Sequence, residues 1–310
     1  MGNTMQRAFL GIEIGGSKLQ LVAGDETAAL TERQRCTVDP AQGAQGIQRQ
    51  IAAALPALAA KWKPVAIGVG FGGPVDWKSG RIARSHQIEG WSEFDLGGWL
   101  RELTKLPVTV ENDSNLATLA EATLGAGAGF SPVFYFNLGS GVGGGLAIDG
   151  RIYHGRAPGE VEFGHLRLDK SGTIVEQRCS GWAIDRRLRA LAAEAPDSPL
   201  ARLIGSPPGG EAKYLRAALD AGDTLARRVL SELADDLGFA LSHVVHLFHP
   251  EVIVLGGGLS LIGEPLRAAV AEVLPRYVME VFHSGLQVKL AALGEDAVPI
   301  GALLLARSLA

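Results

Sequence analysis

The sequence predicts an α/β protein built from two related halves. Short apolar runs alternate with longer segments whose apolar residues recur at helical spacing, a pattern typical of α/β proteins with partly parallel sheets. Two of these runs, FLGIEI and VFYFNL, are each followed by a glycine-rich turn and a second apolar run. The chain has 310 residues, 47% of them hydrophobic, which is more natural for two domains than for one.

The N-terminal half opens with a predicted hairpin, in which strands at 9–14 and 19–24 flank the turn Gly15-Gly16. Residues 42–61 have the composition and spacing of a helix, and Pro64 follows as a stop. The remaining expected elements are a strand at 65–71 ending in Gly72-Gly73-Pro74, a helix at 96–104, a strand at 108–110 and a helix at 115–124 capped by Ser114.

A second predicted hairpin, with strands at 133–138 and 146–148, belongs to the C-terminal half. It repeats the first hairpin's order of strand, glycine turn, strand and Gly/Asp turn about one domain length further on, so the halves are predicted to be related. The elements expected after it are helices at 182–194 and 224–247, a strand at 251–255 ending in Gly256-Gly257-Gly258, a helix at 264–277, a strand at 286–292 and a helix at 298–308.

Composition disfavours several classes of protein. The net charge is −4 without a block of like charge, which argues against a nucleic-acid partner. Cys36 and Cys179 are the two cysteines, and they form neither a disulfide framework nor a cysteine-rich zinc pattern. The sequence has no apolar run of membrane-spanning length and no long apolar core before the first strand. We therefore expect a cytoplasmic protein with a small-molecule partner and no membrane partner.

The stretch FNLGSGVGGGLAIDG, residues 136–150, has G-x-G-x-x-G spacing at Gly139, Gly141 and Gly144. A site for NAD would need a helix directly after these glycines, whereas the residues that follow alternate like a strand and turn at Asp149-Gly150. Two alternatives remain: the glycines form a tight hairpin only, or their backbone N–H groups converge on phosphate. Two such turns and a third glycine cluster at 256–258 favour a pair of turns that clasp a triphosphate.

Several motifs resemble those of known proteins. LGIEIGGSK resembles the first phosphate motif of the superfamily of sugar kinases, heat-shock chaperones and actin, FNLGSGVGGGL its second phosphate motif, and VIVLGGGLS its adenosine motif. More narrowly, GVGFGGPVD, VENDSNLATLAE, GEVEFGH and CSGWAI resemble the ROK family, named for repressors, open reading frames and kinases. The resemblance runs in the family's order from Leu10 to about Ala306.

The resemblance implies an actin-like (ribonuclease H-like) ATPase fold, with ATP and sugar in a cleft between two α/β domains. The smaller domain would comprise residues 1–116 with about 294–310, and the larger one residues 117–293. The implied activity is glucokinase-like: the ATP-dependent, Mg²⁺-assisted phosphorylation of a hexose or N-acetylhexosamine, by a homodimer. A ROK repressor would need a helix-turn-helix segment before the first strand near Ala8, and we expect none. A non-catalytic protein that binds sugar and ATP is the remaining alternative.

By the same resemblance Asp113 is the general base, because phosphoryl transfer needs a carboxylate beside the attacking hydroxyl. Without the family match, Asp113 would be read as a cap of the helix that follows. The residues implied to bind the sugar, besides Asp113, are Gly72, Gly73, Asn112, Glu162, His165 and Glu176. Those implied to bind ATP are Gly15, Gly16, Ser17, Lys18, Gly139, Ser140, Gly141, Gly143, Gly256, Gly257 and Gly258.

Two departures from the family pattern stand out. Glu13 replaces the usual aspartate that lies near Mg²⁺, often through water; it keeps the charge and adds a methylene. Many ROK proteins carry a C-x-C-G-x-x-G-C zinc motif after the histidine that matches His165, but here the segment is HLRLDKSGTIVEQRC. Structural zinc generally takes four ligands, so we predict no zinc site. The sequence leaves open what orders this shortened loop.

Overall fold

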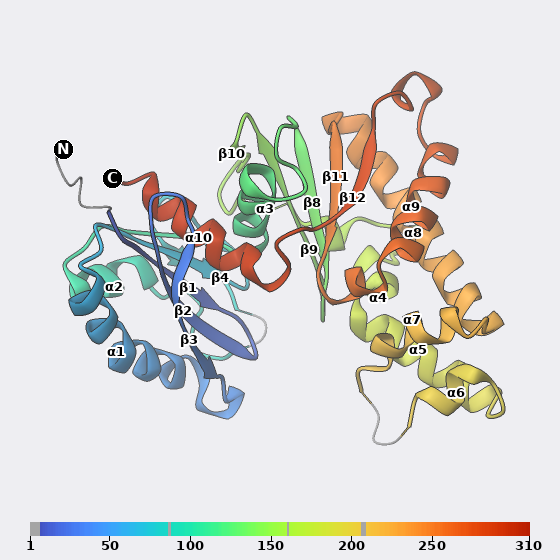
Figure 1. Ribbon diagram of the computed structural model, residues 1–310, viewed down its shortest axis with the longest axis horizontal. Helices are drawn as coiled ribbons and strands as arrows, with labels where there is room; N and C mark the ends of the chain where they lie inside the picture. Colours follow the sequence, from blue (N-terminus) through green and yellow to red (C-terminus); the bar gives the residue numbers. More distant parts are fainter. Residues whose placement is uncertain (1–6, 86–87, 160, 206–208) are drawn as a thin grey trace. The chain divides into compact units, whose positions relative to one another are not determined.

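The computed structural model describes residues 7–85, 88–159, 161–205 and 209–310 (Figure 1). The chain divides into two compact units. Unit 1 comprises Met1–Thr123, Arg151–Val161 and Glu295–Ala310, and unit 2 comprises Leu124–Gly150 and Glu162–Gly294. None of the helices in the described ranges combines the length and apolar character that a membrane crossing requires.

Unit 1 contains a five-stranded sheet in the order β3-β2-β1-β4-β7. Strand β1 is antiparallel to β2 and parallel to β4, which in turn is parallel to β7. A short hairpin of β5 (Val75–Asp76) and β6 (Arg81–Ile82) follows β4. The sheet strands are β1 (Phe9–Ile14), β2 (Lys18–Gly24), β3 (Leu30–Thr37), β4 (Ile67–Phe71) and β7 (Val108–Asn112), and the helices are α1 (Gly43–Trp62), α2 (Leu96–Thr104), α3 (Asp113–Leu124) and α10 (Ala297–Arg307).

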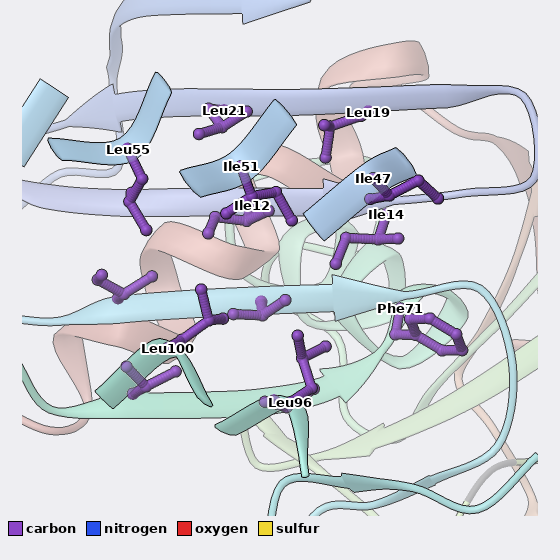
Figure 2. Close-up of a cluster of buried hydrophobic side chains, with 14 of the residues drawn as sticks. Ile12, Ile14, Leu19, Leu21, Ile47, Ile51, Leu55, Phe71, Leu96 and Leu100 are labelled. Atoms are coloured by element: carbon purple, nitrogen blue, oxygen red, sulfur yellow. The ribbon is translucent and has the colours of Figure 1, made fainter. Parts of the chain in front are cut away.

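The core of unit 1 lies on both faces of this sheet. On one face, Figure 2 shows side chains of α1, among them Ile47, Ile51 and Leu55, beside those of β1 and β2. On the other face α10 packs against β1 and β4. Glycine allows this approach, since a Cβ atom on Gly68 would lie 1.9 Å from the backbone oxygen of Ala302. Helix α10, near the end of the sequence, therefore covers a face of the sheet formed by the first strands of the chain.

Unit 2 contains four neighbouring strands in the order β9-β8-β11-β12. Strand β8 is antiparallel to β9 and parallel to β11, which repeats the arrangement of β1, β2 and β4. This repetition confirms the predicted relation between the halves. The strands are β8 (Val133–Leu138), β9 (Val142–Ile148), β11 (Val252–Gly256) and β12 (Gln287–Leu290), and the helices are α4 (Val175–Cys179), α5 (Gly181–Glu194), α6 (Pro199–Leu203), α7 (Leu215–Asp220), α8 (Thr224–Phe248) and α9 (Glu264–Val273). The two-residue strand β10 (Arg151–Ile152) belongs to unit 1.

Three sequence predictions need correction. Helix α3 begins at Asp113, and Ser114 is not its cap: Asn112 Oδ1 accepts hydrogen bonds from the backbone N–H groups of Ser114 and Asn115. Strand β9 begins at Val142, so its glycines lie within the strand. The helix expected at 264–277 ends at Val273, and a 3-10 turn completes it.

Candidate active site

Asp113 lies where β7 passes directly into α3. A Cβ atom on Gly72, just after β4, would lie 3.3 Å from Asp113 Oδ2, so glycine at position 72 keeps this side of the carboxylate uncrowded. Desolvation, and after it the negative charge of Glu13, raise the pKa of Asp113 to about 6. A carboxylate with a raised pKa beside a glycine is suited to accept a proton from a hydroxyl group.

Glu13 is buried on β1 opposite Gln20 of β2. Lys18 Nζ lies 2.8 Å from Glu13 Oε1, and Gln20 Nε2 donates to Oε2 over 2.7 Å. The first glycine turn is closed by a hydrogen bond from Gly15 N–H to the backbone oxygen of Lys18. Because the charges of Glu13 and Asp113 repel each other, a divalent cation beside them would stabilise both carboxylates. The donor set therefore fits Mg²⁺.

Asn112 joins the ends of β4 and β7. Its Nδ2 donates to the backbone oxygen of Gly73 over 3.2 Å, while its Oδ1 caps α3. The amide nitrogen carries two hydrogens, so one remains for a ligand. Unit 1 thus brings together the predicted residues of both motifs, namely Glu13, Gly15, Gly16, Ser17, Lys18, Gly72, Gly73, Asn112 and Asp113.

The sequence did not predict a buried polar cluster beside these residues. Glu111 Oε1 accepts from Asn115 Nδ2 and from the Asn112 backbone N–H, each over 2.9 Å. Its Oε2 pairs with His154 Nε2 at 2.5 Å, and the His154 ring stacks on Trp77 with centroids 4.1 Å apart. Glu111 belongs to the motif VENDSN, but its partner lies 43 residues further on. Local sequence therefore gave no signal for the pair.

In unit 2 the second glycine turn, Gly139–Gly141, connects β8 to β9. Because a strand follows, the prediction that this turn does not open a helix is confirmed. The turn is nevertheless joined to the start of another helix, since Gly181 N–H at the first turn of α5 donates to Gly139 O over 2.7 Å. Helix N-termini and glycine turns both favour anions, which suits the predicted phosphate contact.

A cavity of about 400 Å³ opens beside this turn. Gly257, at φ 78°, approaches the end of β8 so closely that a Cβ atom would lie 2.5 Å from Leu138 N. The exposed Trp182 of α5 supplies a large apolar wall. The lining includes Gly139, Ser140, Gly181, Trp182, Lys213, Arg216, Gly258 and Leu259, so it contains three of the predicted ATP-binding residues. Gly143 lies outside this lining, within β9, and Gly256 ends β11.

Glu162 and His165 lie at the short 3-10 turn Phe163–His165, with Oε2 and Nε2 4.0 Å apart. Both side chains are more than half exposed. The turn lies flush on β9, because a Cβ atom on Gly164 would be 2.3 Å from Val142 O. Val142 N–H in turn donates to Glu176 Oε2 over 2.9 Å. The start of β9 therefore contacts both the turn that carries Glu162 and His165 and the side chain of Glu176.

The residues present do not fit the family's zinc site. The segment 166–175 contains no thiol and a single carboxylate, that of Asp169. Cys179 is buried, and desolvation raises its pKa, whereas zinc binds the thiolate. Within the described ranges, no group of three or more His, Cys, Asp or Glu side chains is arranged to hold a metal ion.

Known proteins resemble this chain over nearly its full length. A glucokinase from Halalkalibacterium halodurans is 31% identical over 309 residues, covering 95% of this chain and 93% of that protein. A glucokinase from Thermotoga maritima is 29% identical, covering 95% of each. The crystal structure of a ROK family glucokinase from Streptomyces griseus in complex with glucose and AMPPNP matches with a TM-score of 0.84 and 31% identity, covering 97% of this chain and 99% of that one.

These matches confirm the predicted actin-like ATPase fold. The model of the ROK family matches residues 9–308, a range that includes the glycine turns, Asp113 and the loop after His165. Since the match extends over both units, the chain belongs to the ROK family.

Proposed function

We propose that this chain transfers the terminal phosphoryl group of ATP to a hydroxyl group of a hexose or N-acetylhexosamine, with glucose as the first candidate and Asp113 as the general base. The chain is an ATP-dependent sugar kinase, as its glucokinase relatives indicate. The observation that supports the proposal most directly is the Asp113 carboxylate, with its pKa raised to about 6 and the uncrowded side kept by Gly72.

In this mechanism the sugar hydroxyl donates its proton to Asp113 as its oxygen attacks the phosphorus atom. The residues that orient the sugar are Gly72, Gly73, Asn112, Glu162, His165 and Glu176. Orientation matters because phosphoryl transfer depends mainly on in-line placement and on neutralisation of charge.

The phosphates would be held by backbone N–H groups of the two glycine turns, 15–17 and 139–141. Lys18 supplies a positive charge beside the first turn and offsets Glu13 in the free protein. When bound, Mg²⁺ would neutralise charge on the phosphates, with Glu13 as the residue that holds it, directly or through water. The nucleoside would occupy the 400 Å³ cavity of unit 2, beside Trp182 and Gly258.

A coupled assay of ADP release tests the proposal across a panel of hexoses and N-acetylhexosamines. We expect sugar-dependent turnover that falls by about a thousandfold or more in Asp113→Asn, because the amide cannot accept the proton. Asp197→Asn, at an exposed aspartate of unit 2, is the matched control and should keep wild-type turnover. ATP binding without turnover on any sugar would favour the non-catalytic alternative.

A further inference from the structure

The loop that lacks the zinc motif is ordered by one aspartate. Asp169 Oδ1 accepts three hydrogen bonds from the residues that follow it: from Ser171 Oγ over 2.6 Å, Gly172 N–H over 2.9 Å and Thr173 N–H over 3.2 Å. Gly172 takes a φ of 109°, which lets the chain reverse at this point. Hydrogen bonds from side-chain hydroxyls and backbone N–H groups lower the pKa of Asp169 well below its usual range. Its carboxylate is therefore charged at neutral pH.

Below this tip the loop is a short ladder. Leu168 N–H donates to Thr173 O over 2.8 Å, Arg167 and Ile174 form an antiparallel bridge, and Val175 N–H donates to Leu166 O over 2.9 Å. The two ends of the ladder are directly bonded to residues predicted to bind sugar, because Leu166 follows His165 and Val175 precedes Glu176. The closed loop thus fixes the separation of His165 and Glu176.

The second strand of the ladder runs directly into α4, which begins at Val175. Arg178 Nε donates to Asp236 Oδ2 of α8 over 2.7 Å, which anchors α4 in the helical layer of unit 2. Glu176, in the same short helix, accepts from Val142 N–H. With α4 fixed at this end, opening of the loop would displace mainly the Glu162–His165 side.

We propose that the Asp169 carboxylate takes the place that zinc has in the family motif: it closes the loop 166–175 and so positions His165 and Glu176 for the sugar. Asp169 is a positioning residue in this proposal, which rests on the proposed sugar site for its kinetic consequence. The only carboxylate in the loop is that of Asp169, and its three hydrogen bonds close the tip of the loop at residues 169–173 without a metal ion.

Two variants and a control test this role. Asp169→Ala removes the acceptor, and Asp169→Asn keeps one oxygen but loses the charge. We expect amide hydrogen exchange at Gly172 and Thr173 to accelerate by about tenfold in Asp169→Ala, since both backbone N–H groups lose their charged acceptor. The KM for sugar should rise by a similar factor of about ten, while kcat and the KM for ATP change by less than about threefold. Asp169→Asn should fall between wild type and Asp169→Ala, and Asp197→Ala should behave as wild type.

The metal content of the purified full-length protein completes the test. We expect less than stoichiometric zinc, and treatment with EDTA followed by removal of the chelator should leave the exchange rates at Gly172 and Thr173 unchanged. One zinc ion per chain whose removal accelerates this exchange would overturn the proposal, as would an Asp169→Ala protein with wild-type exchange. The exchange and metal measurements need no turnover, so they decide the loop's role even if no sugar in the panel is phosphorylated.

Discussion

Asp113 carries a carboxylate that changes charge close to neutral pH, so its chemistry and its cost to folding are linked. Its pKa of about 6 arises first from desolvation and then from the charge of Glu13. The hydrogen bond from Ser114 and the charge of Lys18 act in the opposite direction. A base with these neighbours is active only when ionised, which is the state that the surrounding protein disfavours.

The pH dependence of kcat/KM for the sugar follows from this pKa. We expect kcat/KM to be level above about pH 7 and to fall by about tenfold per unit below about pH 6, because protonated Asp113 cannot act as a base. Initial rates of ADP release at subsaturating sugar measure this profile. A flat profile between pH 5 and 8 would remove Asp113 from the role.

The contribution of Asp113 to the free energy of unfolding should fall as the pH rises, whereas kcat/KM rises with pH. The pKa of Asp113 is higher in the folded state, at about 6, than its ordinary value of 3.8, so the ionised carboxylate costs stability above pH 6. We expect Asp113→Asn to be more stable than wild type at pH 8, by at most about 3 kcal/mol from two pKa units. This advantage should shrink as the pH falls from about 6 toward 4. Denaturant unfolding at several pH values measures it, and an unchanged difference would contradict this origin.

At the scale of elements, the pair Glu111–His154 fastens the segment after β10 to the end of β7. Asn115 strengthens the same junction, because its Nδ2 donates both to Glu111 Oε1 and to the backbone oxygen of Gly159. Glu111 is nearly fully buried and directly precedes Asn112 and Asp113. The pair therefore helps to fix the backbone that carries Asp113.

Two substitutions at His154 separate its hydrogen bond from its ring. His154→Phe keeps the stacking on Trp77 and loses the donor, so we expect a loss of about 1.5–3 kcal/mol in unfolding free energy, because Glu111 is left with an unpaired buried oxygen. His154→Gln keeps a donor at a similar reach and should recover part of this loss. Both unfolding free energies and kcat would be measured. A Gln variant as damaged as the Phe variant would show that the hydrogen bond is not what matters.

Elements with buried apolar runs could be predicted from the sequence, and those without them could not. Strand β1 and helix α2 have the predicted bounds, because their apolar residues face one core. Strand β3 has the sequence LTERQRCT and no buried residue, so it lacks the alternation that marks a strand with one buried face. The start of α3 was misplaced because the side chain of Asn112, rather than that of Ser114, caps it.

The same distinction holds for the candidate site. Contiguous motifs such as VENDSN indicated Asn112 and Asp113, whereas the pairing of Glu111 with His154 depends on a segment that returns to β7 from elsewhere in the chain. The role of Asp169 was also hidden. An aspartate followed by Ser, Gly and Thr is common in loops, and its importance comes from the positions of His165 and Glu176 at the loop's two ends.

At the scale of the whole molecule, the packing of α10 on β1 and β4 buries one face of the sheet of unit 1. We expect Gly68→Ala to destabilise the protein by about 3 kcal/mol, because the added methyl group would collide with the backbone of Ala302 and push α10 away. Gly205→Ala is the matched control: among the residues that the structure describes, none lies within 4 Å of a Cβ atom there, so its effect should stay within about 0.5 kcal/mol. Denaturant unfolding measures both, and equal effects would contradict the close approach.

This packing also sets an order of events during synthesis. Strands β1 and β4 are translated early, but the helix that covers one of their faces consists of Ala297–Arg307. All of unit 2 leaves the ribosome before that helix does. The nascent chain must therefore carry the uncovered glycine-lined face of its first sheet through most of translation, and the domain that is begun first is the last to close.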